Sequence, residues 1–391
     1  MLAAPAFSKI TVNGQTAVFI DRREPEPLQL AVKDLASDLH KVFRHPVVVI
    51  HDPSRFGCLM ITACPRPFRS PRAGNGYVFK LSLPPGPARP AGSDVLGSIY
   101  AVYQFSQQFL GVDPLYWWTD HPPAPKAEVS VPDNYVETRA PVFHYRGFFI
   151  NDEDLLTGWR SGIPDGADIS LKTWNRVYEA ILRLKGNMVI PGTWIFPYEP
   201  QIKEAEERGL IITQHHVNVL GLDTYRWPQD KPYSFISHPE LVEATWKRSI
   251  EQYPPHAKIV WSVGYRGQND YPFWLVDKSA PKTAAGRAHV IQKAIEKEIE
   301  ILKQIHPHAQ IVMNAWMEAA RFIREGLLKL PPGVTLVWPD DGHGMIQDGG
   351  DLGAGEGVYY HLNYAQNSAL SGLAAEFYPS LFVLVRVLTR R

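Results

Sequence analysis

Short apolar runs recur through the second part of the sequence, and nearly every one is followed at once by acidic, basic, imidazole or aromatic side chains. The runs cover residues 148–150, 187–190, 211–213, 259–261, 311–313, 336–338 and 358–360. Segments with helical spacing separate them, and this alternation indicates a parallel sheet. In a barrel of parallel strands the reactive side chains lie at the carboxyl ends of the strands, because the following loops converge on one mouth. The pattern therefore predicts an α/β fold with one polar site.

Seven such runs are one fewer than the eight strands of a closed barrel. Helices are expected at 171–185 and 288–305, where apolar residues recur at helical spacing. We therefore predict an incomplete TIM (β/α)8 barrel over residues 140–364, or one closed by an atypical segment. Residues 365–391 contain an apolar run without a polar motif at its end, so they are predicted to form an atypical C-terminal tail.

Residues 1–135 predict a separate N-terminal α/β domain. The expected elements are strands at 17–21 and 47–50 and helices at 28–42 and 99–109, the second helix ending at Gly111. A Pro-rich segment at 122–132 predicts an extended linker between this domain and the barrel.

Composition argues against several classes of function. Lys plus Arg and Asp plus Glu both number 40, so the formal net charge is zero, and a nucleic-acid partner held by phosphate attraction is not expected. No apolar run reaches the roughly 18 residues of a membrane span, and residues 1–7 lack the pattern of a signal peptide. The aromatic fraction of 12%, with 11 Trp, would supply flat surfaces on which sugar rings stack, although most rings are expected in the core.

Three adjacent acidic residues, Asp152, Glu153 and Asp154, follow the first run. Carboxyls this close repel one another unless substrate hydroxyls, an Arg or unequal burial separate their pKa values. A helix N-cap is the alternative interpretation of Asp154.

Two imidazoles, His215 and His216, follow the third run. Such a pair is more often hydrogen-bonded inside a core than bound to a metal, and no zinc-site spacing surrounds it. We expect no metal here, and neutral imidazoles that donate to sugar hydroxyls or to a carboxylate.

Arg266 and Asp270 follow the fourth run. An Arg at a strand end can hold a substrate carboxylate through two parallel hydrogen bonds, a geometry that Lys does not match. A surface Arg–Asp pair of little energetic value is the alternative.

Glu318 follows the fifth run and stands close to Trp316 and Met317. A carboxyl framed by these residues would be desolvated, which raises its pKa and suits a general acid. The alternative is a first-turn Glu stabilised by the helix dipole. The last two runs are followed by more polar and aromatic residues, namely Asp340, Asp341, Tyr359, Tyr360, His361 and Tyr364.

Together these stretches resemble glycoside hydrolase family 115, the xylan α-1,2-glucuronidases. The similar segments are 145–154, 186–194, 215–216, 266–270, 338–342 and 357–361, with 99–103 and 116–120 near the N-terminus. They extend over about residues 10–364 and are specific in combination. The resemblance implies an α/β domain before a TIM barrel. It also implies an exo-acting, inverting hydrolase that removes (4-O-methyl-)glucuronic acid from xylan side chains.

The resemblance further implies roles for individual residues. Glu318 is expected as the acid and Asp270 as the base, with Asp152 as the second choice for either role. The residues expected to bind substrate are Glu153, Trp194, His215, His216, Arg266, Asp340, Asp341, Tyr359, His361 and Tyr364. Inversion requires an acid and a base roughly 6.5–9.5 Å apart on opposite faces of the sugar. No cofactor and no metal are implied.

The resemblance implies an extracellular protein whose substrate is glucuronoxylan or an aldouronic acid, and a family that forms homodimers through a C-terminal region. The similarity stops near Tyr364, so a C-terminally truncated chain is expected. Such a chain would express poorly or be inactive alone, because an open barrel edge leaves strand hydrogen-bonding groups unpaired. Two other interpretations stay open. One is a different exo-glycosidase on the same two-domain plan, for N-acetylhexosamine or another uronide; the other is a non-catalytic carbohydrate-binding remnant.

Overall fold

The computed structural model describes residues 9–51, 58–61, 77–80, 89–92, 94–132, 136–139, 141–150, 169–193, 195–224, 227–228, 230–341, 345–347 and 352–361. The chain divides into two compact units. The first, called the N-terminal unit, comprises Met1–Phe148, Leu171–Met188 and Glu207–Leu210. The second, called the sheet unit, comprises Phe149–Ser170, Val189–Glu206 and Ile211–Arg391.

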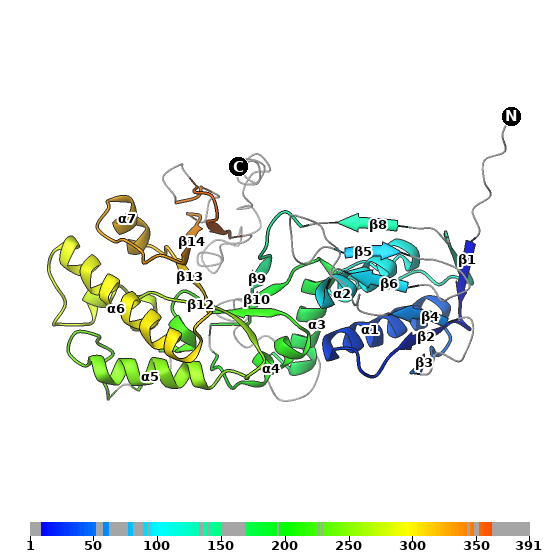
Figure 1. The fold of residues 1–391 in the computed structure, drawn as a ribbon, viewed down its shortest axis with the longest axis horizontal. Coiled ribbons are helices and arrows are strands. Elements are labelled where there is room, and N and C mark those ends of the chain that lie inside the picture. Colours follow the sequence, from blue (N-terminus) through cyan, green and yellow to red (C-terminus); the bar gives the residue numbers. More distant parts are fainter. Residues whose placement is uncertain are drawn as a thin grey trace. The chain divides into compact units, whose positions relative to one another are not determined.

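Three helices pack together in the N-terminal unit (Figure 1). They are α1 (Glu26–Phe43), α2 (Val95–Phe105) with the π-helical turn η1 (Ser106–Leu110) that continues it, and α3 (Leu171–Arg183). Helix α2 packs against both α1 and α3. The chain leaves η1 through Gly111, whose φ of 77° is the left-handed conformation that glycine adopts without strain. The helices predicted at 28–42, 99–109 and 171–185 are therefore confirmed.

The strands of this unit form three small sheets. β1 (Lys9–Asn13) pairs antiparallel with β7 (Glu128–Pro132), β2 (Ala17–Ile20) lies between β3 (Val49–Ile50) and β4 (Cys58–Ile61), and β5 (Tyr77–Lys80) lies between β6 (Arg89–Gly92) and β8 (Val136–Arg139). The interpretation of 122–132 as a linker is wrong for its last five residues, which form β7. In β7 the buried Val129 and Val131 alternate with the exposed Glu128 and Ser130, the period of a half-buried strand.

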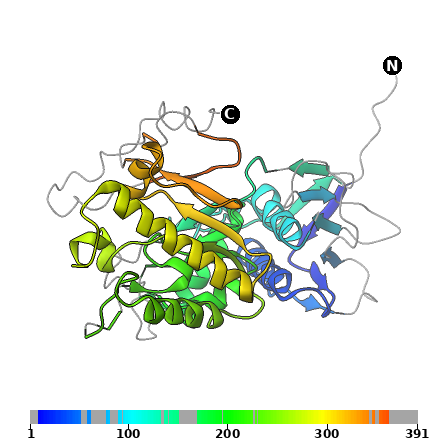
Figure 2. The ribbon, with the colours of Figure 1, turned by 60° about the vertical axis from the view of Figure 1, so that its left-hand side comes forward.

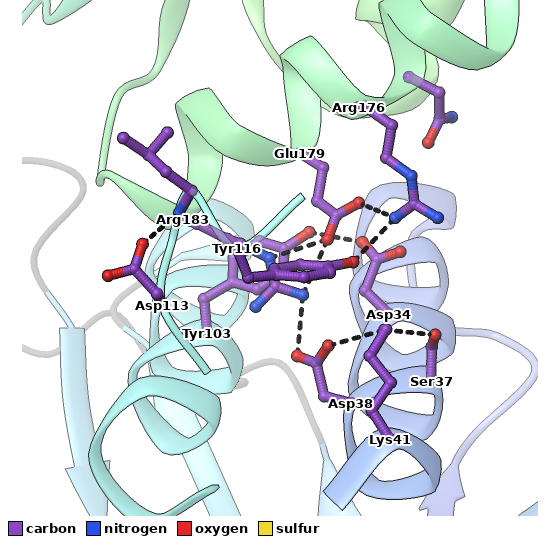
Figure 3. Close-up of polar contacts among 12 residues, drawn as sticks. Asp34, Ser37, Asp38, Lys41, Tyr103, Asp113, Tyr116, Arg176, Glu179 and Arg183 are labelled. Atoms are coloured by element: carbon purple, nitrogen blue, oxygen red, sulfur yellow. Dashed lines mark hydrogen bonds and ion pairs between the residues drawn. The ribbon is translucent and has the colours of Figure 1, made fainter. Parts of the chain in front are cut away.

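A network of buried charges connects α1 with α3 inside the N-terminal unit (Figure 3). Nη2 of Arg183 lies 2.8 Å from Asp38 Oδ2 and 2.8 Å from Glu179 Oε1, and all three side chains are at most 3% exposed. Arg208 pairs with Asp34 of α1 in the same network. Buried charges are costly unless they are paired, so these contacts hold the two helices in one arrangement.

The sheet unit is built on seven strands in the order β15-β14-β13-β12-β11-β10-β9. The strands are β9 (Gly147–Phe149), β10 (Met188–Ile190), β11 (Ile211–Thr213), β12 (Lys258–Ser262), β13 (Gln310–Asn314), β14 (Val334–Pro339) and β15 (Gly357–Tyr359). Neighbours from β11 to β15 pair in parallel. The predicted parallel sheet of seven strands is confirmed, and within the described residues it ends at β9 and β15 as a partial barrel.

Helices cover this sheet on its outer face (Figure 2). They are α4 (Pro200–Glu207), α5 (Pro239–Glu251), α6 (Ala284–Ile305) and α7 (Glu318–Arg324). The loops of this unit contain the short 3-10 turns η3 (Val219–Gly221), η5 (Gln268–Asp270) and η6 (Phe273–Leu275). Helix α5 packs beside α6. Their apolar faces, with Trp246 and Ile295, join Trp261 of β12 and Ile311 of β13 in one core. This core fixes the strands whose ends carry the polar residues.

Two predictions lie partly outside these observations. The domain boundary near residue 135 stays a prediction. The contacts group α3 and Glu207–Leu210 with the N-terminal residues, so the N-terminal unit is not one continuous range of the chain. The tail at 365–391 lies outside the described residues. No helix in the described part of the chain has the length and apolar character needed to cross a membrane.

Candidate active site

Polar side chains from five neighbouring strands lie at the carboxyl edge of the sheet. His215 and His216 follow β11, Arg266 and Asp270 follow β12, Glu318 follows β13, Asp340 follows β14, and His361 follows β15. Adjacent strands are paired in parallel, so their carboxyl ends reach the same edge. The contacts among these side chains form one continuous cluster.

Arg266 occupies the middle of the cluster. Its Nε lies 2.9 Å from Asp270 Oδ1, and its Nη1 lies 3.1 Å from Glu318 Oε2. Its Nη2 donates to the main-chain carbonyl of Asp270. The guanidinium is 10% exposed, so one buried cation lies between two carboxyls.

The loop after β12 folds back on itself and thereby brings Asp270 to Arg266. Gly267 N donates to Tyr271 O at 2.7 Å, and a Cβ on Gly267 would approach that oxygen to 2.9 Å. Asp270 has a φ of 61°, a left-handed conformation that is uncommon outside glycine. Met317, just before Glu318, has a φ of 48°. Strained backbone of this kind is found where a site must place its side chains accurately.

The two carboxyls have pKa values that move in opposite directions. Burial raises the pKa of Glu318, and the attraction of Arg266 offsets this only in part. Burial also acts on Asp270, but the hydrogen bond and charge of His216 and the charge of Arg266 lower its pKa overall. The pKa values of the two carboxyls are therefore pushed apart, as in sites where one carboxyl serves as an acid and the other as a base.

The two histidines are buried against aromatic rings. Burial lowers the pKa of both His215 and His216. His216 Nε2 lies 3.2 Å from Asp270 Oδ1. Each ring is stacked: His215 on Phe149 at 4.6 Å between centroids, and His216 on Trp316 at 4.2 Å. The histidines therefore link the carboxyl pair to an aromatic wall.

Asp340 and His361 form a second polar pair in the cluster. Asp340 is fully buried and accepts from the main-chain N of His361 at 3.1 Å, while His361 Nδ1 contacts the same oxygen. The His361 ring lies 5.7 Å from Trp316 and 5.3 Å from Tyr359 between centroids. These contacts place Asp340, His361 and Tyr359 next to the histidine pair.

The predicted residues do not all fall in this cluster. Asp341 is exposed, and its Oδ1 accepts from Met345 N at 3.0 Å within its own loop. The remaining predicted positions, Asp152, Glu153, Asp154, Trp194 and Tyr364, lie outside the described residues. Their roles stay predictions.

Several buried polar atoms of the cluster make no hydrogen bond of acceptable geometry within the described part of the chain. They are both carboxyl oxygens of Glu318, Nε and Nη1 of Arg266, and Oδ1 of Asp270. Four of these atoms still face one another as ion pairs, Arg266 Nε with Asp270 Oδ1 and Arg266 Nη1 with Glu318 Oε2. Buried polar groups are normally satisfied, so Oε1 of Glu318 is the atom of this set that is left for a ligand among the described residues. Among the described residues, no three His, Cys, Asp or Glu side chains stand close enough to share a metal ion.

Sequence reasoning missed two contributors. Phe149 was read only as part of a strand, yet its ring stacks on His215. Glu298 was not among the predicted site residues, yet this acidic side chain is fully buried. The spacing held a signal, because Glu298 lies seven residues after Ile291 and three after Ile295, on the apolar stripe of α6.

A partial barrel of parallel strands with a pair of buried carboxyls at its strand ends is the arrangement of a glycoside hydrolase. The model of Glycosyl hydrolase family 115 matches residues 138–377, which is more than half of the chain. The chain belongs to this family.

Solved structures show the same fold. A family GH115 4-O-methyl-α-glucuronidase with specificity for decorated arabinogalactans aligns with a TM-score of 0.77 at 21% identity, over 91% of this chain and 50% of that one. The chain thus spans half the length of that glucuronidase. The Streptomyces plicatus N-acetyl-β-hexosaminidase aligns with a TM-score of 0.52 at 12% identity, over 86% of this chain and 67% of that one. The Flavobacterium johnsoniae chitobiase also has a TM-score of 0.52 at 12% identity, over 87% and 54%. No curated protein matches the sequence.

Proposed function

We propose that this chain carries the catalytic site of an inverting α-glucuronidase, which removes (4-O-methyl-)glucuronic acid from polysaccharide side chains. The observation that carries the proposal is the position of Arg266, a buried cation flanked by Asp270 and Glu318. Family membership and the likeness to a 4-O-methyl-α-glucuronidase support it.

Glu318 is the proposed acid and Asp270 the proposed base. Burial raises the pKa of Glu318, which favours the protonated form that gives its proton to the glycosidic oxygen as the C–O bond breaks. Asp270, ionised beside His216 and Arg266, can take a proton from the water that bonds to the anomeric carbon. Asp152 remains the second choice for either role.

Arg266 is the proposed receptor for the uronate. Its Nε and Nη1 contact the carboxyls of Asp270 and Glu318, so a ligand carboxylate binds Arg266 by competing with these two side chains. A uronate bound there adds negative charge near Glu318, and a neighbouring negative charge raises the pKa of a carboxyl. Binding the acidic sugar therefore favours the protonated form of the proposed acid.

The aromatic wall is the proposed surface for the sugar ring. Trp316 and Phe149 present flat faces next to the histidines, and such faces pack against the C–H side of a pyranose. We include Glu153, Trp194, Asp340, Asp341, Tyr359, His361 and Tyr364 in the proposed substrate contacts. The proposed substrate is glucuronoxylan or an aldouronic acid, and the proposed location of the protein is extracellular.

The test replaces Arg266 by Met and measures release of glucuronic acid from an aldouronic acid and from a decorated arabinogalactan. Arg248→Met is the matched control, because Arg248 is an exposed residue in the last turn of α5. Loss of a charge-assisted pair of hydrogen bonds should lower kcat/KM by about a hundredfold in Arg266→Met. Arg248→Met should keep wild-type activity.

Other outcomes would refute the proposal. Release of N-acetylhexosamine without release of glucuronic acid would identify a different exo-glycosidase, and binding of aldouronic acid without turnover would identify a carbohydrate-binding remnant. Equal activity of Arg266→Met and wild type would show that Arg266 does not bind the uronate.

A further inference from the structure

A carboxyl outside the candidate active site is buried in the core of the sheet unit. Glu298 of α6 is 0% exposed, and its Oε2 accepts a 2.8 Å hydrogen bond from the main-chain N of Gly264. Its other oxygen has no hydrogen-bond partner among the described residues. Burial raises the pKa of Glu298 well above its usual value, and no cation in the described part of the chain compensates.

The position of Glu298 on α6 does not itself require a carboxyl. Its neighbours at helical spacing, Ile291, Ala294, Ile295 and Leu302, are all buried apolar residues. An apolar side chain would suit this stripe better, because burying a polar group is costly unless it is hydrogen-bonded. The contact with Gly264 is therefore the feature that distinguishes Glu298 from its neighbours.

Gly264 marks the point where the chain leaves the sheet towards Arg266. Val263 N still donates to Val312 O at 2.9 Å, which continues the ladder between β12 and β13. Gly264 N instead turns to Glu298, and Gly264 has a φ of 148°. A Cβ on Gly264 would meet its nearest neighbour at 3.7 Å, so the backbone conformation requires glycine and crowding does not.

The residue between Gly264 and Arg266 is also fixed from outside the loop. The Tyr265 hydroxyl accepts from Phe235 N at 2.8 Å, and the Tyr265 ring is buried. Glu298 and Phe235 thus hold the two residues that precede Arg266.

We propose that Glu298 is a positioning residue for Arg266: its carboxyl anchors the Gly264 amide and so aims the guanidinium at the space between Asp270 and Glu318. This role of Arg266 rests on the proposed function. Glu298 touches no residue of the reacting cluster directly and acts through the backbone of residues 264–266.

The test compares Glu298→Leu and Glu298→Gln with Glu300→Leu as the matched control. Glu300 lies on the same helix but is exposed and pairs with Lys297 at 2.7 Å. The dissociation constant for an aldouronic acid is measured by calorimetry. Hydrogen exchange is measured for the peptide that contains residues 263–266, and thermal unfolding shows that each variant is folded.

Glu298→Leu should weaken aldouronic acid binding about tenfold or more and speed exchange at Gly264, because its amide loses its acceptor. Glu298→Gln keeps an oxygen acceptor, so binding and exchange should stay close to wild type. Gly264→Ala should disturb the same stretch of backbone in a second way, because alanine does not tolerate the φ of Gly264. It should therefore weaken aldouronic acid binding as Glu298→Leu does.

Wild-type binding in Glu298→Leu, or equal losses in Glu298→Gln and Glu298→Leu, would overturn the proposal. If the wild-type chain binds no aldouronic acid, the proposed function fails. The exchange measurement then still decides whether Glu298 holds this backbone, since unchanged exchange in Glu298→Leu would refute it.

Discussion

At the scale of single residues, Glu318 and Asp270 share one guanidinium but differ in how their ionisation affects stability. The pKa of Glu318 is raised in the folded chain, so its stabilising contribution is full below the unfolded pKa and is lost as pH rises through the folded pKa. The pKa of Asp270 is lowered, so its contribution is present above the unfolded pKa and is lost as pH falls through the folded pKa.

Glu318→Gln and Asp270→Asn should therefore shift thermal stability in opposite directions. Between about pH 4 and pH 7, Glu318→Gln should gain stability relative to wild type, because the variant lacks a carboxyl whose ionisation favours unfolding. Asp270→Asn should lose stability relative to wild type over the same range. Thermal midpoints measured across pH test both, with Glu325→Gln, an exposed Glu just after α7, as the control. Shifts of the same sign in both variants would contradict the assignment.

The position of these residues after strands could be predicted, and their connections could not. Apolar runs mark where strands end, and the geometry of a parallel sheet brings the residues that follow each strand to the same edge. The contact between His216 Nε2 and Asp270 Oδ1 forms where Asp270 has a left-handed backbone conformation, and the residue type alone does not predict that conformation. The stacking of Phe149 on His215 joins strands distant in sequence, so periodicity along the chain carries no trace of it.

At the scale of elements, buried charges hold α1 and α3 in their arrangement. The spacing of these charged residues along the helix would instead predict that they are exposed to solvent. Glu179 and Arg183 are one turn apart on α3, a spacing typical of an exposed ion pair. In the structure both side chains are at most 3% exposed and meet Asp38 of α1 (Figure 3). Tertiary packing also decides the structure of β7. The prolines of the 122–132 segment favour a linker, but the short alternation of exposed and buried residues in β7 is that of a strand.

The two arginines that pair with Glu179 should differ sharply in their effect on stability. Arg183→Met leaves the buried Asp38 and Glu179 without their shared partner, which should cost about 3–5 kcal/mol of unfolding free energy. Arg176→Met removes a pair whose cation is 35% exposed, and Glu179 keeps Arg183, so the cost should be about 1 kcal/mol or less. Urea unfolding of both variants measures the difference. Equal losses would mean that burial does not set the strength of these pairs.

At the scale of the whole molecule, the sequence composition and the contacts in the structure assign different residues to the N-terminal unit. Prolines after residue 121 suggest a boundary near 135, whereas the contacts include α3 and Glu207–Leu210 in the N-terminal unit. Asp34 and Asp38 lie before that boundary, and their partners Arg208 and Arg183 lie after it. A sequence shows where charges are but not which distant charges will neutralise them.

The fragment 1–135 tests which description holds. It lacks Arg183 and Arg208, the described arginine partners of Asp38 and Asp34, and it also lacks α3, which packs against α2. Folding it would therefore bury two carboxylates without these partners or leave the face that α3 covers exposed. The fragment should show no cooperative unfolding transition by circular dichroism. The same fragment with Asp34→Asn and Asp38→Asn is the control; it should recover structure in part, because a neutral amide is much less costly to bury than a carboxylate. A cooperative transition in the unsubstituted fragment would show that residues 1–135 form a domain that does not need the arginines of the later segments.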